Sequence, residues 1–299
     1  MQADIVTRPG RLCHNARLLE GGTVLADRDD DLGKALLPGA GEAIDPTELA
    51  RRDLKKSLPK RFYKSAASEA FSENGVTLHA IVLDGRRVRT PAQNALAVTS
   101  AALAQAMAQE WQAQGEHIEP GLMPVTRLVN SAIDGVAREM DSVLAEIVKY
   151  AGSDLLCYRA GDPDNLVAAQ EAAWNPVLDW LRQECGARFM LAQGVMFVTQ
   201  PPEAVAAFES ALKASVGEGR GAVLRLAALN VMTTLTGSAL LALAAARGFR
   251  DAPAAWRAAH VDEDHQMQVW GEDAEALARR ERRWREMQAA ALVLALSGS

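Results

Sequence analysis

Apolar and polar residues alternate along VTLHAIVLDGRRVRTP, residues 76–91, and this period of two predicts a β-hairpin. Asp84-Gly85 predicts the tight turn, because both positions tolerate positive φ, and Pro91 predicts the end of the second strand, because proline cannot donate to the ladder. Two strands alone are marginally stable, so we expect a further strand at residues 62–71. One face of the first hairpin strand carries Val76, Leu78, Ala80 and Val82.

The apolar period becomes helical after the hairpin. Thr99 or Ser100 is suited to cap the start of a first helix, and Gly115 is placed to end it. Its apolar stripe falls on Leu103, Met107 and Trp111. Trp111 therefore has a structural interpretation, in which it closes the stripe that packs on the core.

Further helical patterns fill the rest of the chain. A long helix is expected from Pro124 to about residue 151, and another from 164 to 185 that contains Pro176, where a kink or a new segment is expected. Residues 188–198 predict a short hairpin. The remaining helices are expected at 203–216, 221–247, 252–270 and 272–295.

This order predicts an α+β fold, because strands come first and helices follow without βαβ alternation. We expect a small N-terminal antiparallel β-rich domain with the first helix, residues 57–122, followed by a larger, mostly α-helical C-terminal domain, residues 123–299. Residues 1–56 carry Gly-Gly, an Arg-Asp-Asp-Asp run and little apolar periodicity. They predict a weakly ordered N-terminal extension.

Composition narrows the functional classes. The chain has 299 residues, a net charge of −6 and a pI of about 5.5, which gives no electrostatic footprint for nucleic acid or an anionic membrane. The N-terminus has no signal-peptide core and is too acidic for a transit peptide, and three widely spaced cysteines fit a reducing compartment. We therefore expect a cytoplasmic protein. The uncharged run at 226–246 contains several polar residues and is interpreted as a buried helix rather than a stable membrane insertion.

Local signatures of catalysis are missing from the sequence. It contains no GxxxxGK[ST] loop, no GxSxG elbow and no HExxH. The densest polar cluster is AAHVDEDHQMQVWGED, residues 258–273, where His260 and Asp264 share a helical face and have the spacing of two metal ligands. We expect no catalytic residue, no metal and no cofactor, and thus no enzyme. A metal-dependent enzyme with a site around His260–His265 stays open as an alternative.

Several short segments occur in an order that resembles a known family. They are KRFYK at 60–64, LDGRRVRTP at 83–91, EWQAQGEHI at 110–118, MPVTRLVNSAID at 123–134, DLLCYRA at 154–160, QEAAWNPVLDW at 170–180, TGSALLALA at 236–244 and VDEDHQMQVWGEDAEA at 261–276. Together they resemble the assembly chaperone family for the alpha subunit of the F-type ATP synthase catalytic head, which occurs in mitochondria and alphaproteobacteria. The resemblance covers residues 60–296.

The resemblance implies a non-catalytic chaperone that binds the free alpha subunit and prevents its aggregation until assembly with the beta subunit. It also implies a protein that is monomeric when free, in the bacterial cytoplasm or, for organellar relatives, in the mitochondrial matrix. On this interpretation Trp111, Met123 and Arg127 form the joint between the two domains. Asp262, Glu263 and Asp264 are the candidate contact with the partner. A solvated helix face is the other interpretation of the three acids, and a general holdase is the other binding function.

Overall fold

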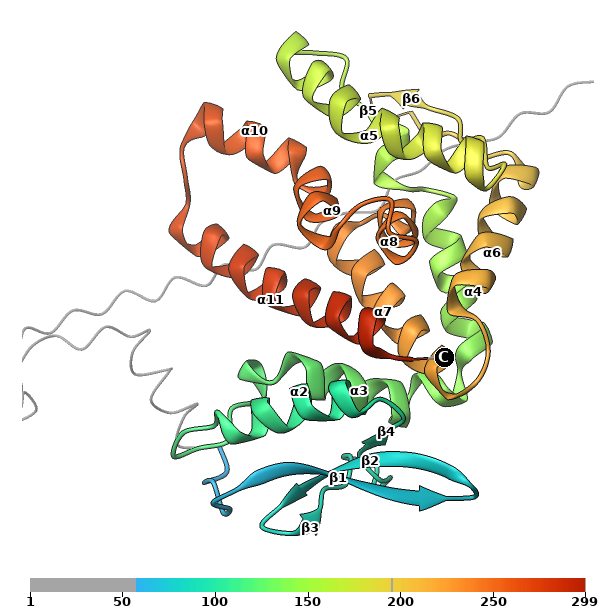
Figure 1. The fold of residues 1–299 in the computed structure, drawn as a ribbon. Helices are drawn as coiled ribbons and strands as arrows, with labels where there is room; N and C mark the ends of the chain where they lie inside the picture. Colours follow the sequence, from blue (N-terminus) through green and yellow to red (C-terminus); the bar gives the residue numbers. More distant parts are fainter. Residues whose placement is uncertain (1–57, 195, 299) are drawn as a thin grey trace, which may run out of the picture. The chain divides into compact units, whose positions relative to one another are not determined.

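The chain forms an antiparallel sheet first and helices afterwards, as its pattern predicts (Figure 1). The computed structural model describes residues 58–194 and 196–298. The sheet contains β1 (Ala66–Glu73), β2 (Val76–Leu83), β3 (Arg86–Arg87) and β4 (Ala97–Val98). All three other strands pair antiparallel with β2, which is therefore the central strand.

Two tight turns set the register of this sheet. Asp84-Gly85, with φ of 47° and 78°, joins β2 to β3 as predicted. Asn74-Gly75, with φ of 51° and 79°, joins β1 to β2, and this second Asn-Gly signal was missed in the sequence. The extra strand predicted at residues 62–71 is β1, whose hydrogen bonding begins later, at Ala66.

Strand β2 is buried on both faces in its second half, which the predicted alternation did not include. Leu78, Ala80 and Val82 are buried as expected, and Ile81 on the opposite face is also buried. Val76 is exposed, because it lies beside the β1–β2 turn. Ile81 belongs to the main core, whereas Leu83 at the strand end belongs to a small separate cluster.

Helix α2 (Ala101–Gln112) begins where the sequence predicts. The Ser100 hydroxyl accepts a hydrogen bond from the Leu103 amide at 3.2 Å, which satisfies one of the free N–H groups of the first turn. The helix ends at Gln112, so Gly115 lies beyond it and does not form its cap. Figure 1 shows α2 and α3 lying along the same side of the sheet.

Three predicted helices are each divided into two in the structure. The break at residue 135 separates α3 from α4, Gly237 separates α7 from α8, and His260 separates α9 from α10. Gly237 adopts the left-handed conformation with φ of 67°, which ends α7. The helices after α2 are η1 (Pro120–Leu122), α3 (Pro124–Asp134), η2 (Val136–Arg138), α4 (Met140–Ala151), η3 (Leu155–Cys157), α5 (Asp164–Glu184), α6 (Pro202–Val216), α7 (Arg220–Thr236), α8 (Ala239–Ala246), α9 (Ala252–Ala259), α10 (Val261–Trp270) and α11 (Ala274–Leu296).

The hairpin predicted at residues 188–198 is wrong. This segment contributes one short strand, β6 (Ala192–Gln193), which pairs in parallel with β5 (Tyr158–Arg159). Outside β6, the described residues of this segment form no strand, and Met190, Leu191, Met196 and Phe197 are exposed. Pro176, in contrast, lies inside α5, which continues through it from Asp164 to Glu184.

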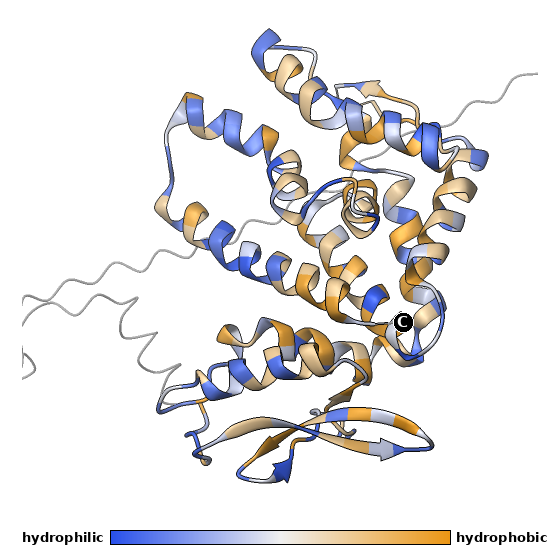
Figure 2. Ribbon diagram, in the orientation of Figure 1, coloured by the Kyte–Doolittle hydropathy of each residue, from blue (hydrophilic) through white to orange (hydrophobic). Residues whose placement is uncertain are grey.

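The main core includes α8, whose residues Ala239–Ala244 are all buried. Figure 2 shows this helix as hydrophobic. The main core extends from Ile81 in the sheet to Val293 on α11, so it includes residues on both sides of the predicted domain boundary after residue 122. That boundary stays a prediction. No helix in the described part of the chain is long and apolar enough to span a membrane, and residues 226–246 are divided between α7 and α8.

The predicted extension, residues 1–56, lies outside the described residues. We expect removal of residues 1–56 to leave a soluble protein that unfolds cooperatively. The apolar side chains of the main core are already packed against one another in the remaining part. The melting temperature should change by less than about 3 °C, which corresponds to about 1 kcal/mol in a chain of this size. Differential scanning calorimetry of the truncated and full-length chains tests this, and an insoluble truncated chain would contradict it.

Candidate partner-binding site

The three acids singled out in the sequence lie in the first turn of α10. Carboxylates are favourable there, because the N-terminus of a helix carries partial positive charge. Helix α10 has no buried residue of its own, and Figure 2 shows it as mostly hydrophilic. Its position must therefore come from contacts of individual side chains with the neighbouring helices.

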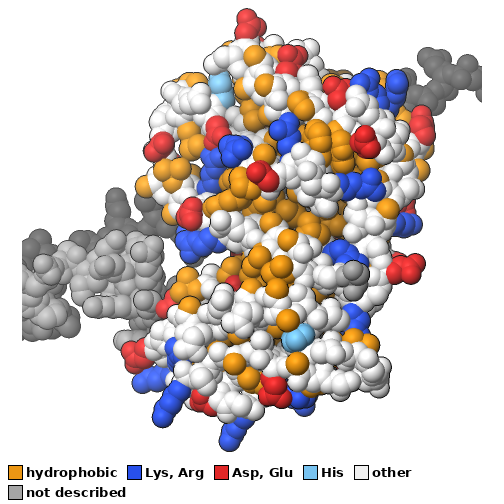
Figure 3. Space-filling view, in the orientation of Figure 1, with side chains coloured by type: hydrophobic (Ala, Val, Ile, Leu, Met, Phe, Trp, Pro, Cys, Tyr) orange, Lys and Arg blue, Asp and Glu red, His pale blue; other side chains and the backbone are white. Residues whose placement is uncertain are grey.

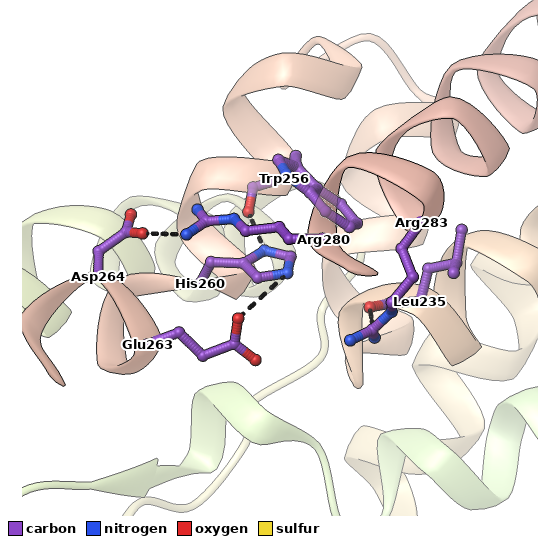
Figure 4. Close-up of polar contacts among 7 residues, drawn as sticks. All are labelled: Leu235, Trp256, His260, Glu263, Asp264, Arg280 and Arg283. Atoms are coloured by element: carbon purple, nitrogen blue, oxygen red, sulfur yellow. Dashed lines mark hydrogen bonds and ion pairs between the residues drawn. The ribbon is translucent and has the colours of Figure 1, made fainter. Parts of the chain in front are cut away.

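His260 fixes the start of α10. The residue is only 2% exposed, and its Nδ1–H donates to the Trp256 carbonyl at 2.7 Å (Figure 4). The imidazole lies against the Trp256 ring with 3.9 Å between ring centroids. Burial lowers the pKa of His260, so the ring is neutral at neutral pH. The histidine thus ends α9 and begins α10 as a packed, neutral side chain.

Two of the three acids hold α10 in place. Asp262 accepts a hydrogen bond from Gln170 Nε2 at 2.7 Å, and the buried Gln170 also accepts from the Ala160 amide at 2.8 Å. Asp264 forms an ion pair with Arg280 of α11 (Figure 4). Asp262 therefore connects α10 to α5, and Asp264 connects it to α11.

Glu263 differs from its neighbours. Its side chain is 57% exposed, and its Oε2 lies 3.7 Å from Nε2 of His260. Since His260 is neutral, this contact does not neutralise the carboxylate. Of the predicted partner-binding acids, Glu263 is the one whose charge faces solvent, and its role in binding stays a prediction.

A groove of about 300 Å³ lies between α10 and the first turns of α11. It is lined by residues that include Glu263, Met267, Trp270, Leu277, Arg280 and Arg283. Arg283 donates to the Leu235 carbonyl at 2.6 Å and so anchors α11 on α7 (Figure 4). We call this feature the α10–α11 groove. Its lining combines apolar side chains with charged side chains of both signs.

Trp270 is the most solvent-exposed large apolar side chain among the described residues, at 86%. It ends α10, and Gly271, with φ of 90°, turns the chain toward α11. The sequence predicted a helix end at residue 270 and a new helix from residue 272, but it did not predict the exposure of Trp270. A Trp-Gly pair after a polar helix is the signal that was available, since an indole usually packs inside a protein.

The three predicted joint residues occupy different environments. Trp111 is half-buried and touches both the main core and the small cluster, which contains Tyr63, Leu83, Ile118 and Met123. Met123 is buried in that cluster, directly before α3. Arg127 is exposed and lies 3.3 Å from Glu286 of α11. Their predicted function as a domain joint is untested by these contacts.

Glu110 joins α2 to α3 and was missed in the sequence. Its two carboxylate oxygens accept hydrogen bonds from the Val125 and Thr126 amides, each at 2.8 Å. It therefore caps the start of α3 from a neighbouring helix, in place of a local capping residue. Burial raises the pKa of Glu110, against the lowering effect of these hydrogen bonds.

The alternative metal site at His260 and Asp264 does not fit the geometry. The Asp264 carboxylate is engaged by Arg280 and is not free to bind a metal ion. Within the residues that the structure describes, no group of three or more His, Cys, Asp and Glu side chains is placed to hold a metal ion.

Comparisons with known proteins give a consistent result. A family model described as ATP12 chaperone protein matches residues 60–182. The crystal structure of the Atu1473 protein from Agrobacterium tumefaciens is 48% identical, with a TM-score of 0.75, over 85% of this chain and 92% of that one. The crystal structure of Atp12 from Paracoccus denitrificans is 38% identical, with a TM-score of 0.71, over 80% of this chain and 99% of that one.

Proposed function

Because this chain belongs to the ATP12 chaperone family, we propose that it binds the free alpha subunit of the F-type ATP synthase and prevents its aggregation until the beta subunit arrives. The physical need is general. A ring subunit presents a large apolar interface before its neighbours are present, and such a surface aggregates in water. We expect a monomeric cytoplasmic protein that works without a cofactor or a catalytic step.

The α10–α11 groove is the observation that carries this proposal. Trp270 is held at the end of a helix with its indole exposed, and the charged Glu263 lines the same groove. Exposed tryptophan is the residue type most often found at the energetic centre of protein interfaces. A carboxylate beside it adds selectivity for a partner with basic residues at the matching position.

The contacts of Asp262 and Asp264 suit a protein that binds its partner reversibly. Asp262 and Asp264 keep α10 in position through contacts within the chain, so little ordering is needed on binding. A preformed groove lowers the entropic cost of association. A contact with a polar component is also displaced more readily than a fully apolar interface when the true neighbour arrives.

Co-expression and pull-down tests the proposal. The tagged chain is expressed with the cognate alpha subunit, with and without the beta subunit. We expect alpha to be captured alone, and the captured amount to fall when beta is present. Failure to capture alpha would contradict the proposal. Equal protection of two unrelated aggregating proteins would indicate a general holdase instead.

Glu263→Lys should weaken capture of alpha and leave the fold intact. The side chain is exposed, so its replacement should change the free energy of unfolding by less than about 1 kcal/mol. At the interface the substitution replaces an attraction by a repulsion, and we expect binding at least about tenfold weaker, which is about 1.4 kcal/mol. The dissociation constant and the melting temperature are measured on the same preparation.

Glu146→Lys is the matched control for this substitution. Glu146 is an exposed acid on α4, so the net charge changes equally while the α10–α11 groove is untouched. It should bind alpha like the unmodified chain. Equal weakening by both substitutions would mean that net charge, rather than a contact at Glu263, governs the affinity.

A further inference from the structure

The segment between α5 and α6 exposes four large apolar side chains. Met190 is 54% exposed, Leu191 48%, Met196 72% and Phe197 72%. We call these four residues the 190–197 patch. Residues 189–202, FMLAQGVMFVTQPP, contain no charged residue. The patch is therefore both apolar and neutral, unlike the α10–α11 groove, whose lining includes charged side chains of both signs.

This segment is held at its base and at its middle. The buried Gln200 accepts from the Met190 amide at 2.7 Å and donates to the Met190 carbonyl at 3.0 Å. Strand β6 pairs with β5 beside α5 (Figure 1), and the Gly194 amide donates to the Arg159 carbonyl at 2.9 Å. Phe189, directly before the patch, turns inward and packs edge-on against the buried Phe208. Hydrogen bonds and packing thus hold Phe189, Met190, Gly194 and Gln200, which lie within or beside the run that carries the four exposed side chains.

The exposed area has the size of an interaction site. A large side chain that is fully buried removes roughly 150–250 Å² from water, so four that are about half to three-quarters exposed present roughly 500 Å². The largest apolar patch on a soluble monomer is of about this size and is often functional. Figure 3 shows apolar side chains gathered over the middle of one face of the molecule.

The exposed area of the 190–197 patch also limits what kind of partner can bind there. A stable dimer buries about 800 Å² on each partner, which is more than this patch offers. A contact of this size instead fits a larger interface to which other surfaces contribute. Methionine side chains are flexible and polarisable, so they adapt to apolar surfaces of different shape.

We infer that the 190–197 patch is a second contact for the client, and that it covers an uncharged, apolar part of the subunit interface that the unassembled alpha subunit exposes. This inference rests on the proposed function. On this inference the two surfaces contact the client differently. The α10–α11 groove binds it through the charge of Glu263 and the indole of Trp270, and the 190–197 patch covers apolar area that would otherwise face water.

The test uses the double variant Met196→Ser with Phe197→Ser in the full-length chain. Both side chains are exposed, so the melting temperature should not fall. We expect the dissociation constant for alpha to rise at least about tenfold, as for the loss of an interface anchor, and protection of alpha from aggregation to fall in parallel. Light scattering of alpha diluted from denaturant measures the second effect.

Phe62→Ser is the matched control, because Phe62 is 76% exposed and lies before β1. Normal binding by this variant, with weak binding by the double variant, supports the inference. Capture of alpha by the unmodified chain and equally by the double variant would overturn it while leaving the proposed function in place. If the unmodified chain captures no alpha, both fail together.

Two further experiments on the same variants test whether the 190–197 patch binds a second copy of this chain or a lipid surface instead of alpha. Analytical ultracentrifugation would reveal a dimer that the double substitution dissociates, which would assign the patch to a second copy of this chain. Sedimentation with phosphatidylcholine–phosphatidylglycerol vesicles would reveal lipid binding that the double substitution abolishes. Either result would overturn the inference, and we expect a monomer that leaves the vesicles in the supernatant.

Discussion

Trp111→Arg is expected to lower the free energy of unfolding by about 3 kcal/mol. The indole fills the space between the main core and the small cluster, and its ring meets Tyr63 edge-on at 5.8 Å. Arginine would lose this contact area and place a charge beside buried apolar side chains. In a chain of this size the melting temperature should fall by roughly 6–12 °C. Chemical denaturation followed by circular dichroism measures the effect.

Trp270→Arg provides the comparison, because the same substitution is made at an 86% exposed indole. It should change the melting temperature by less than about 2 °C. Trp111→Phe, which keeps an aromatic ring at the joint, should be milder than Trp111→Arg. A Trp111→Arg chain that is as stable as the unmodified one but fails to bind alpha would refute the structural role of Trp111 and make it a contact residue.

Local signals in the sequence were sufficient for β1, β2, the turn into β3 and the starts of several helices. They did not predict β4, and β3 is shorter than the strand expected up to Thr90. The Asp84-Gly85 turn requires positive φ at both positions, and Ser100 caps α2 through a contact three residues away. Such features depend on neighbours in the chain, so single-sequence reasoning finds them. The Asn74-Gly75 turn was equally available and was overlooked.

The helix breaks are only partly encoded locally. Gly237 in the left-handed conformation and Ser238, whose hydroxyl caps α8, are a local signal that was overlooked. Residues that are distant in the sequence also stabilise each break. Asp154 is 84 residues from Ser238, whose hydroxyl donates to it at 2.7 Å. At the other break, His260 packs against the Trp256 ring, and Trp256 in turn lies beside Trp284 of α11, with 5.5 Å between the two ring centroids. Only the folded chain brings these groups together.

The candidate site shows the same limit. The resemblance directed attention to Asp262, Glu263 and Asp264, but it could not separate the carboxylate that faces solvent from the two that are engaged. That separation depends on Gln170 and Arg280, which lie on other helices. The exposure of Trp270 likewise depends on where α10 ends. The 190–197 patch was hidden in the sequence because its apolar alternation was interpreted as a hairpin.

Asp154 is expected to make the stability of the chain depend on pH. It is fully buried and accepts hydrogen bonds from the Ser238 hydroxyl at 2.7 Å and from the Leu156 and Leu240 amides at 3.1 Å each. These bonds fix η3 against the start of α8. Burial nevertheless raises the pKa of Asp154 from 3.8 to about 6, because the hydrogen bonds offset only part of the desolvation of its charge.

The sign follows from linkage between protonation and folding. The folded chain holds the proton of Asp154 more tightly than the unfolded chain does. Protonation of Asp154 therefore contributes fully to the free energy of unfolding below pH 3.8, and this contribution is lost as the pH rises through about 6. The loss amounts to at most about 3 kcal/mol.

Asp154→Asn lacks this titration, so the difference in stability between the two chains reports the contribution of Asp154. We therefore expect the unmodified chain to lose stability relative to Asp154→Asn by up to about 3 kcal/mol between pH 4 and pH 7.5. Urea unfolding of both chains across this range measures the difference. A difference that is constant with pH would show that Asp154 keeps an ordinary pKa in the folded chain, and that its three hydrogen bonds fully compensate the burial of its charge.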